Sequence, residues 1–348
     1  MNNGNPQYRY TIIIPHYKLP DGLRMCLESI PNRPDLQVVV VDDASDEKTI
    51  ESLNSLEKIF PKVEFVYSNQ NGYGGKARNI GLSYALGDYI IFSDTDDTFT
   101  ADFNKVLDDY KDTQLDLVFF KTNMLDSETH NPTPKEHHLN EYIDLWATDP
   151  KKAELYLRYM FGEPWCKMVK RQVILENNIR FDETRINNDT TFSYLVGHYS
   201  KSIAVDQRAI YNYMVRTGST SRQKDKERYY IKIYVFGRSE LFFRQHNIPL
   251  HEDRQYLALS NFIKRRDYSG FKKGFHKLED LGYNKKVIRK EYSRTMGLCK
   301  FLVPIWNVLF VPDIVIKLYC LFYWFSLSIP RLVKYRLLGI ANNELRRY

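Results

Sequence analysis

The sequence predicts an α/β fold in which a doubly wound, mainly parallel sheet is flanked by helices and followed by a helical C-terminal extension. Three observations lead to this prediction. Short continuous apolar runs alternate with helix-like segments through the first third of the chain, as in parallel sheets that are buried on both faces. Apolar residues make up 43% of the 348 positions and charged residues 27%, which is ordinary globular usage. Beyond residue 222 the pattern becomes helical and basic.

Each predicted element follows from a local pattern in the first 121 residues. The first strand, Thr11-Ile-Ile-Ile-Pro15, and the valine-rich second strand are continuous apolar runs, so we expect both of their faces to be buried. The predicted order is strand 11–15, helix 22–30, strand 36–41, helix 47–59, strand 63–67, helix 75–86, strand 88–93, helix 101–112 and strand 115–121. From about residue 122 to 150, polar runs and prolines predict an irregular connection across the working edge of the sheet.

The chain is long enough for more than one domain, and we expect three regions. Residues 1–225 form the α/β domain, residues 226–297 a basic helical extension, and residues 298–348 an apolar and basic tail. The tail holds two uncharged runs, 301–312 and 318–330, each shorter than the roughly 20 residues that a spanning helix needs. We therefore expect in-plane or re-entrant insertion into a membrane surface, with a spanning helix and a packing or dimer surface as the alternatives.

The formal net charge of +7 is compatible with nucleic acid, anionic lipid or a phosphorylated substrate as a partner. Because the basic residues adjoin the apolar tail and no nucleic-acid motif is present, the sequence favours a membrane surface and no nucleic acid. The cysteines lack short paired spacing, which indicates a reducing compartment, and the first ten residues lack the pattern of a secretory signal. We expect a cytoplasmic protein, peripheral on the inner face of the cell membrane.

Three carboxylates follow the predicted strand 88–93 in the run Asp94-Thr-Asp96-Asp97. They would repel one another unless a hard divalent cation, Mn²⁺ or Mg²⁺, bridged them to a diphosphate that completes the coordination shell. In doubly wound sheets, ligands bind beyond the carboxyl ends of the strands, where these residues are expected. The alternative is that the aspartates begin a helix, since Asp is a preferred residue at helix N-termini.

Two further polar segments are expected near the same edge of the sheet. Asp42 and Asp43 follow the second strand, where carboxylates can accept hydrogen bonds from a nucleobase or a ribose, and the alternative is a turn before the helix at residue 47. Residues 69–79 form a glycine loop that leads into a helix. Glycine allows the backbone to approach a ligand closely, and Arg78 is suited to binding a phosphate or a base.

Four segments occur together in a characteristic order and spacing. They are Thr11-Ile-Ile-Ile-Pro15-His-Tyr17, Val41-Asp-Asp-Ala-Ser45, Gly75-Lys-Ala-Arg78-Asn79-Ile-Gly81 and Gly87-Asp-Tyr-Ile-Ile-Phe-Ser-Asp94-Thr-Asp96-Asp97. Together they closely resemble the inverting nucleotide-sugar glycosyltransferases of family 2, which have the GT-A fold. The resemblance continues through Trp165-Cys-Lys167, Phe181-Asp-Glu, Asn188-Asp189 and the segment from Tyr211 to Ser221. It places a GT-A catalytic domain in residues 1–225.

The resemblance implies a role for each matching residue. Those implied to bind the donor are Pro15, Tyr17, Asp43, Arg78, Asp94, Asp96 and Arg216; those implied to hold the metal are Asp96 and Asp97; those implied to contact the acceptor are Trp165 and Asn188; and the implied general base is Asp189. In an inverting transfer, one carboxylate takes the proton of the acceptor hydroxyl as its oxygen attacks opposite the departing diphosphate.

Some positions have alternatives or depart from the family pattern. For Asp189 the alternative is an ordinary cap of the helix that begins at Thr190. Arg216 precedes a small-residue loop that could close over the diphosphate, and the alternative is a strand followed by a solvated turn. Asn188 stands where Glu commonly precedes the base, and Lys18 stands where Asn is common.

The resemblance implies transfer of a sugar, with inversion, from a nucleotide-diphosphate sugar to an acceptor hydroxyl. We expect a UDP-sugar as donor and a glycan or lipid-linked glycan as acceptor, in the synthesis of cell-surface polysaccharide or lipopolysaccharide. One alternative is a catalytically degenerate sugar-nucleotide-binding or scaffold protein of the same fold. Another is a nucleotidyltransferase, but its usual glycine- and arginine-rich signature near the first strand is absent.

Overall fold

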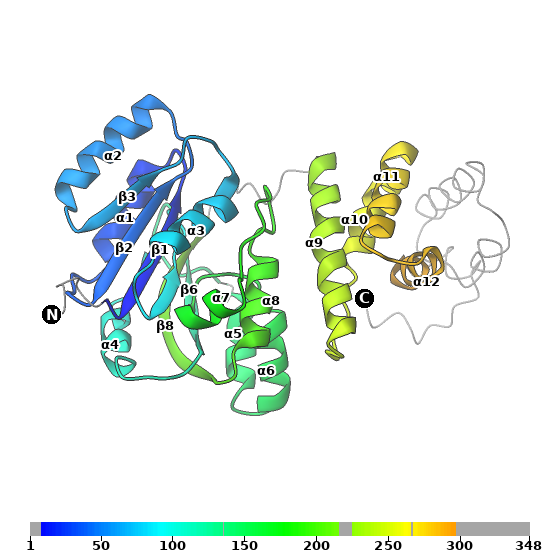
Figure 1. Cartoon of the computed structure of the whole chain (residues 1–348). Coiled ribbons are helices and arrows are strands. Elements are labelled where there is room, and N and C mark those ends of the chain that lie inside the picture. The colour runs from blue at the N-terminus through cyan, green and yellow to red at the C-terminus, as the bar shows by residue number, and fades with distance from the viewer. Residues whose placement is uncertain (1–7, 135, 216–224, 266, 297–348) are drawn as a thin grey trace. The chain divides into compact units, whose positions relative to one another are not determined.

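A computed structural model describes residues 8–134, 136–215, 225–265 and 267–296 (Figure 1). The chain divides into two compact units, Met1–Arg222 and Gln223–Tyr348. Arg216 with its following loop, the N-terminal residues 1–7 and the apolar tail from residue 298 onward lie outside the described residues. The expectations for donor binding by Arg216 and for membrane insertion by the tail therefore stay predictions.

The first unit is built on one eight-stranded sheet flanked by helices (Figure 1). Its strands are β1 Tyr10–His16, β2 Leu36–Asp42, β3 Val63–Tyr67, β4 Tyr89–Phe92, β5 Thr98–Phe99, β6 Leu117–Asp126, β7 Lys167–Lys170 and β8 Ile203–Val215. Its helices are α1 Pro20–Ser29, α2 Glu47–Ile59, α3 Tyr73–Tyr84, α4 Asp102–Asp109, α5 His138–Leu145, α6 Pro150–Tyr159, α7 Arg171–Glu176 and α8 Thr190–Tyr199. The predicted α/β architecture with flanking helices is confirmed.

The strand order β3-β2-β1-β4-β7-β6-β8-β5 combines a parallel half with a mixed half. Strands β3, β2, β1 and β4 are mutually parallel. Strand β7 then pairs antiparallel with both β4 and β6, whereas β6 and β8 run parallel. The sheet is thus less uniformly parallel than the sequence pattern suggested. Strand β7 was not predicted because its four residues are too few to show a clear alternation of apolar and polar side chains.

Both faces of the parallel half are covered, which explains its continuous apolar strands. Successive side chains of a strand point to opposite faces. On β2, Val39 and Val41 pack with Ala77 of α3, while Val38 and Val40 belong to the main core on the other face. Strand β2 is buried along its whole length.

The region from residue 122 to 150 is more ordered than its sequence pattern predicts. Strand β6 continues to Asp126, and α5 follows at His138–Leu145. The strand continues because its end pairs with β8, where Leu125 lies opposite Met214 and Asp126 opposite Val215. That partner strand comes much later in the sequence, so no local pattern could reveal the pairing.

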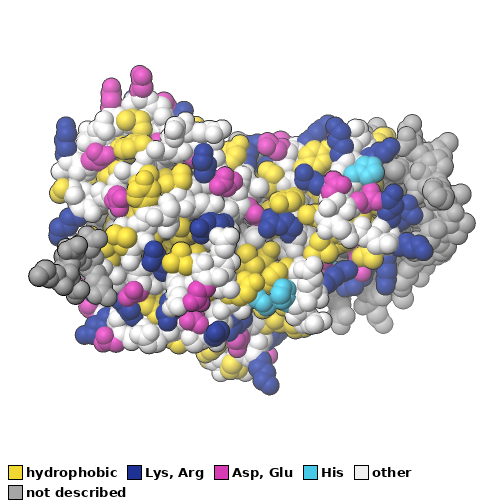
Figure 2. Space-filling model, viewed as in Figure 1, with side chains coloured by type: hydrophobic (Ala, Val, Ile, Leu, Met, Phe, Trp, Pro, Cys, Tyr) yellow, Lys and Arg dark blue, Asp and Glu magenta, His cyan; other side chains and the backbone are white. Residues whose placement is uncertain are grey.

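The second unit is helical in its described part, as predicted for the extension (Figure 1). Its helices are α9 Lys226–Gln245, α10 Arg254–Lys264, α11 Tyr268–Asp280 and α12 Lys285–Met296. They enclose a core of their own that includes Ile233, Leu259, Phe262 and Leu278. On the face shown in Figure 2, Lys and Arg side chains are interspersed with Asp and Glu. Within the described residues, every helix is too short or too polar to cross a membrane.

Candidate active site

The residues at the carboxyl ends of β1, β2 and β4 meet at one edge of the sheet. Strands β1 and β2 are in register there, with His16 opposite Asp42, and the Asp43 backbone N–H donates to the His16 carbonyl over 2.9 Å. After β4, the Thr95 hydroxyl donates to the carbonyl of Pro15. Pro15 therefore lies directly beside the segment that follows β4, because parallel strands bring their carboxyl ends to a common edge.

A side-chain hydrogen bond links the ends of β1 and β2 at this edge. His16 and Asp42 are both buried, with His16 Nδ1 2.8 Å from Asp42 Oδ1. The Leu19 backbone N–H donates to His16 Nε2, so Nδ1 carries the proton and donates to Asp42. Burial opposes ionisation of Asp42, but hydrogen bonds from His16 and Ser45 outweigh it and lower the pKa. The neighbouring Tyr17 is 49% exposed, so its ring lies at the rim of the edge.

Asp43 is buried and holds the glycine loop. Its two carboxylate oxygens accept the Gly72 backbone N–H over 2.9 and 3.1 Å, and the Asn71 side chain donates to its carbonyl. Burial raises the pKa of Asp43. The helix that follows β2 is capped instead by Asp46, which accepts the Thr49 N–H over 3.1 Å. Asp43 therefore fixes the glycine loop rather than the start of α2.

The glycines at the start of α3 permit a close approach within the protein itself. A Cβ at Gly75 would lie 2.0 Å from the carbonyl oxygen of Asp182. Just beyond, the Asn79 side chain donates to the Phe181 carbonyl and accepts the Phe181 N–H, over 3.0 and 2.9 Å. The sequence suggested that the glycines allow a ligand to approach the backbone closely. At Gly75 the group that approaches is the backbone of Asp182, in the segment that leads to Asn188 and Asp189.

The segment after β4, residues 94–97, is called here the acid loop. Asp97 is 1% exposed; its Oδ2 accepts the Tyr211 hydroxyl over 2.9 Å and its Oδ1 accepts the Met214 N–H over 2.7 Å. Burial, with the charges of Asp94 and Asp96, raises the pKa of Asp97 well above its usual range. Helix α4 begins only at Asp102, so the acid loop does not cap a helix.

Arg78 connects the acid loop to the segment before α8. Its side chain is 8% exposed and donates to Asp94 over 2.6 Å and to Asn188 over 3.0 Å. The guanidinium also lies over the Phe181 ring, 5.4 Å from its centroid. Arg78 thereby joins Asp94 and Asn188, which are far apart in the sequence, through the planar fork of donors that only arginine offers.

Asp189 stands immediately before α8 but does not cap that helix. Its side chain makes no capping hydrogen bond, although its backbone carbonyl accepts the Ser193 N–H. Asp189 is partly buried, and this desolvation raises its pKa to about 6, opposed by the positive charge of Arg78 and supported by the negative charges of Glu163 and Asp94. A carboxyl with this pKa is suited to accept a proton near neutral pH.

Trp165 lies in an aromatic cluster next to the acid loop. It is 3% exposed and stacks on Tyr211 and Tyr213, with ring centroids 5.2 and 5.6 Å apart. His137 packs edge-on against Trp165 at 5.2 Å, and burial, with the charge of neighbouring His138, lowers the pKa of His137 to about 4. Trp165 therefore supports the site from below its surface in this structure.

Known proteins are similar to this chain in sequence and in fold. The sequence model of Glycosyl transferase family 2 matches residues 11–176, which include β1, the glycine loop, the acid loop and β7. This part of the chain belongs to glycosyl transferase family 2.

Relatives of the family 2 chain include the minor teichoic acid biosynthesis protein GgaB of Bacillus subtilis strain 168, with 29% identity over 236 residues. That match covers 65% of this chain and 25% of GgaB, so the chain spans only a quarter of that relative. The uncharacterized glycosyltransferase YibD of Escherichia coli K12 is 26% identical over 250 residues, covering 67% of this chain and 70% of YibD. GgaB is thus named for teichoic acid biosynthesis, and YibD is named as a glycosyltransferase.

The fold also matches solved structures. The crystal structure of S. aureus TarS 1-349 in complex with UDP-GlcNAc aligns with a TM-score of 0.56 and 19% identity, covering 81% of this chain and 83% of that one. At that identity the likeness concerns the fold alone. It confirms the GT-A-type fold that the sequence predicted.

The acid loop of the family 2 chain supplies hard oxygen donors of the kind that Mn²⁺ and Mg²⁺ prefer. Asp94 is 32% exposed in its side chain and Asp96 is partly exposed, whereas both oxygens of Asp97 already accept protein hydrogen bonds. Among the described residues, no three His, Cys, Asp or Glu side chains are arranged to hold a metal ion by themselves. The loop thus fits a metal whose shell is completed by diphosphate oxygens, with Asp96 better placed than Asp97 to bind directly.

Some residues that shape the family 2 site were not predicted from the sequence. Tyr211 and His16 lie within the segments that resemble the family, but the sequence assigned neither of them a role. Tyr211 holds Asp97 from β8, and His16 holds Asp42 from β1. Asp97 lies far from Tyr211 in the sequence, and Asp42 lies on the strand next to that of His16. Each pair of side chains therefore meets only because the strands pair.

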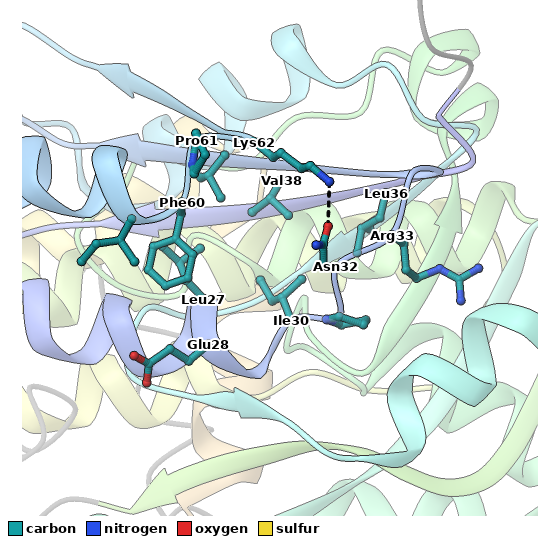
Figure 3. Close-up of a pocket in the computed structure, with 13 residues that line it drawn as sticks. Leu27, Glu28, Ile30, Asn32, Arg33, Leu36, Val38, Phe60, Pro61 and Lys62 are labelled. Atoms are coloured by element: carbon teal, nitrogen blue, oxygen red, sulfur yellow. Dashed lines mark hydrogen bonds between the residues drawn. The ribbon is translucent and has the colours of Figure 1, made fainter.

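A separate pocket of about 490 Å³ lies at the opposite ends of the strands (Figure 3). Its walls include Leu36 and Val63, which are the first residues of β2 and β3, together with Phe60. The Lys62 ammonium donates to Asn32 over 2.9 Å at its rim. This pocket is mostly apolar and lies away from the acid loop, so it is not the candidate site.

Proposed function

We propose that this family 2 glycosyltransferase moves a sugar from a nucleotide-diphosphate donor, a UDP-sugar, to a hydroxyl group of a glycan or lipid-linked glycan, with inversion. The observation that carries the proposal is the meeting of Arg78, Asp94, Asn188 and Asp189, drawn from three separate parts of the chain, at the carboxyl edge of the sheet. Open parallel sheets bind nucleotides at this edge.

The donor would lie between the glycine loop and the acid loop. Asp43 and Arg78 would hold the nucleoside, with Pro15 and Tyr17 beside it, and Asp94 and Asp96 would face the ribose and diphosphate. The fixed position of Asp43 against Gly72 supports this assignment, because a preorganised carboxylate loses little freedom on binding a ligand. A donor role for Arg216 is part of the proposal but lies outside the described residues.

A divalent metal, Mn²⁺ or Mg²⁺, would be held by Asp96, with Asp97 as the neighbouring carboxylate that orients the loop. When bound, such an ion acts as a Lewis acid that stabilises negative charge on the departing diphosphate. The protein's own contribution is to present Asp96 in a rigid loop. Tyr211 and Met214 hold that loop in place through Asp97.

Asp189 would act as the general base. Its carboxylate would take the proton of the acceptor hydroxyl as that oxygen attacks the anomeric carbon, and the diphosphate would leave from the opposite face. A single displacement of this kind inverts the anomeric carbon. The absence of a capping bond leaves the Asp189 side chain available for this role, and its raised pKa suits proton transfer near neutral pH.

The acceptor would approach near Asn188 and above Trp165. GgaB is named as a teichoic acid biosynthesis protein, and TarS was crystallised with UDP-GlcNAc, which support a cell-surface polymer as the product and a UDP-sugar as the donor. We further propose action at the inner face of the cell membrane through the apolar tail, which lies outside the described residues. A truncated protein that ends before residue 298 should no longer float with membranes in a flotation assay.

The decisive experiment is calorimetric titration of wild-type protein and Asp96→Ala with UDP, GDP, dTDP and UDP-GlcNAc, with and without Mn²⁺. We expect metal-dependent binding of one nucleotide by the wild type and loss of that binding in the variant. Absence of binding across the panel would favour a degenerate scaffold protein. Glu51→Ala, an exposed change on α2, is the matched control and should bind as the wild type does.

A further inference from the structure

Lys167 is a charged side chain buried in the core of the first unit. It lies on β7 and is 1% exposed, and its ammonium donates to the carbonyl of Phe161 over 2.6 Å. The ammonium also lies over the Phe161 ring, 4.6 Å from its centroid, and 6.0 Å from that of Phe119. A buried ammonium is costly unless carboxylates compensate its charge, so its partners indicate its purpose.

A chain of hydrogen bonds runs from Lys167 to the backbone of Asp189. Lys167 binds the carbonyl of Phe161, and the Ser193 hydroxyl of α8 donates to the carbonyl of the next residue, Gly162, over 2.6 Å. The Ser193 N–H in turn donates to the Asp189 carbonyl over 2.9 Å. Residues 161–163 are thus held between β7 and the first turn of α8, the helix that Asp189 precedes.

Two cations and two further carboxylates surround Asp189. Glu163 and Asp94 are negative, and Arg78 is positive and bonded to Asp94. Lys167 interacts electrostatically with both Glu163 and Asp189. Burial lowers the pKa of Lys167 to about 7, and those carboxylates oppose the decrease.

We propose that Lys167 is a positioning residue for the transfer reaction: its buried ammonium supplies the positive charge that keeps Asp189 ionised beside Glu163, while its bond to Phe161 holds residues 161–163 against α8. The inference deepens the proposed function and rests on Asp189 acting as the base. Arg78, on α3, is the second cation of the group, and it is bonded to Asp94 and Asn188, whereas Lys167 lies on β7 and is bonded to the Phe161 carbonyl.

The sign of the effect is fixed by electrostatics. Removing a nearby positive charge makes the carboxylate form of Asp189 less favourable, so its pKa rises. The base is then protonated over a wider range, and the acid limb of the pH profile moves to higher pH. A loss of packing alone would lower activity at every pH and would leave the limb where it was.

The test uses the full-length protein and measures the carboxyl group directly. Aspartate carboxyl carbons are labelled with ¹³C, and the Asp189 resonance is identified by its loss in Asp189→Asn. In Lys167→Gln, which keeps an N–H donor for Phe161 but lacks the charge, we expect the titration midpoint of Asp189 to rise by about one pH unit. Lys167→Arg should restore the wild-type midpoint. Ser193→Ala, which removes a bond to residues 161–163 without changing charge, should leave it unmoved.

A reciprocal measurement covers the case in which Lys167→Gln fails to fold. Because the coupling between two groups is mutual, Asp189→Asn must lower the midpoint of Lys167 by the same amount, measured from the ¹³C shift of its Cε. Unmoved midpoints in either experiment, or an equal shift in Ser193→Ala, would overturn the proposal. Full transfer activity in Asp189→Asn would instead overturn the base assignment itself, so the two failures are distinguishable.

Discussion

The hydroxyl of Tyr211 lies 2.9 Å from Oδ2 of Asp97 and also accepts the backbone N–H of Asp94 over 2.8 Å. One buried side chain of β8 therefore holds both ends of the acid loop. The chain places this tyrosine on a strand that pairs with β6 and β5, so the rigidity of the loop depends on the mixed half of the sheet. The proposed metal and donor site is built on that support.

Replacing Tyr211 with Phe should weaken the acid loop while keeping the ring in place. The change leaves a buried Asp97 oxygen and the Asp94 N–H without a partner, which should cost about 1–3 kcal/mol of unfolding free energy. We also expect weaker Mn²⁺-dependent nucleotide binding, because the loop that presents Asp96 is less rigid. Denaturant unfolding and calorimetric titration measure the two effects.

Tyr213→Phe is the matched control for this change. Tyr213 lies on the same strand and stacks on the same Trp165, but its hydroxyl makes no hydrogen bond within the part of the chain that the structure describes. It should unfold close to the wild-type midpoint. Equal stability losses in both variants would show that the hydroxyl of Tyr211 has no special role.

Transfer activity should fall as the pH drops through about 6. Asp189 must be ionised to accept a proton, and burial raises its pKa to about 6, so kcat/KM should decline below that pH and level off above it. Asp189→Asn should lower kcat by about 10²–10⁴-fold with little change in donor affinity, because a general base acts in the chemical step.

The measurement is UDP release from the donor identified by titration, followed from pH 5 to pH 8.5. Asp182→Asn offers a control, since Asp182 lies on the same segment and accepts the Thr191 hydroxyl over 2.6 Å. It should retain the wild-type pH profile even if its stability decreases. An acid limb that persists unchanged in residual Asp189→Asn activity would assign the limb to another group.

Gly197 of α8 should not tolerate a side chain. A Cβ there would lie 2.1 Å from the Arg158 carbonyl oxygen of α6, so Gly197→Ala must separate the two helices. We expect a destabilisation of about 1–3 kcal/mol, typical of overpacking. Gly162→Ala is the control, because a Cβ at Gly162 has no atom within 4 Å, and thermal unfolding of the two variants should differ clearly. Equal melting temperatures would contradict the close packing of α6 and α8.

The parallel half of the sheet was predictable because its signal is local. The apolar runs of β1 and β2 match their buried faces, and α2 has the predicted bounds, Glu47–Ile59. The acidic turn after β4 was also located correctly, since a strand end is marked by the change from apolar to polar residues. The different roles of Asp96 and Asp97 could not be predicted, because the hydrogen bonds that hold Asp97 come from β8, which is distant in the sequence.

By itself, the sequence determined the α/β class, the helical extension and the family, because alternating apolar runs and ordered motifs are properties of neighbouring residues. Only the tertiary structure decided which groups meet. It placed Arg78 between Asp94 and Asn188, Tyr211 against Asp97, and the ammonium of Lys167 near Asp189. These contacts join residues from distant parts of the chain, and they depend on strand order and burial, which no local pattern encodes.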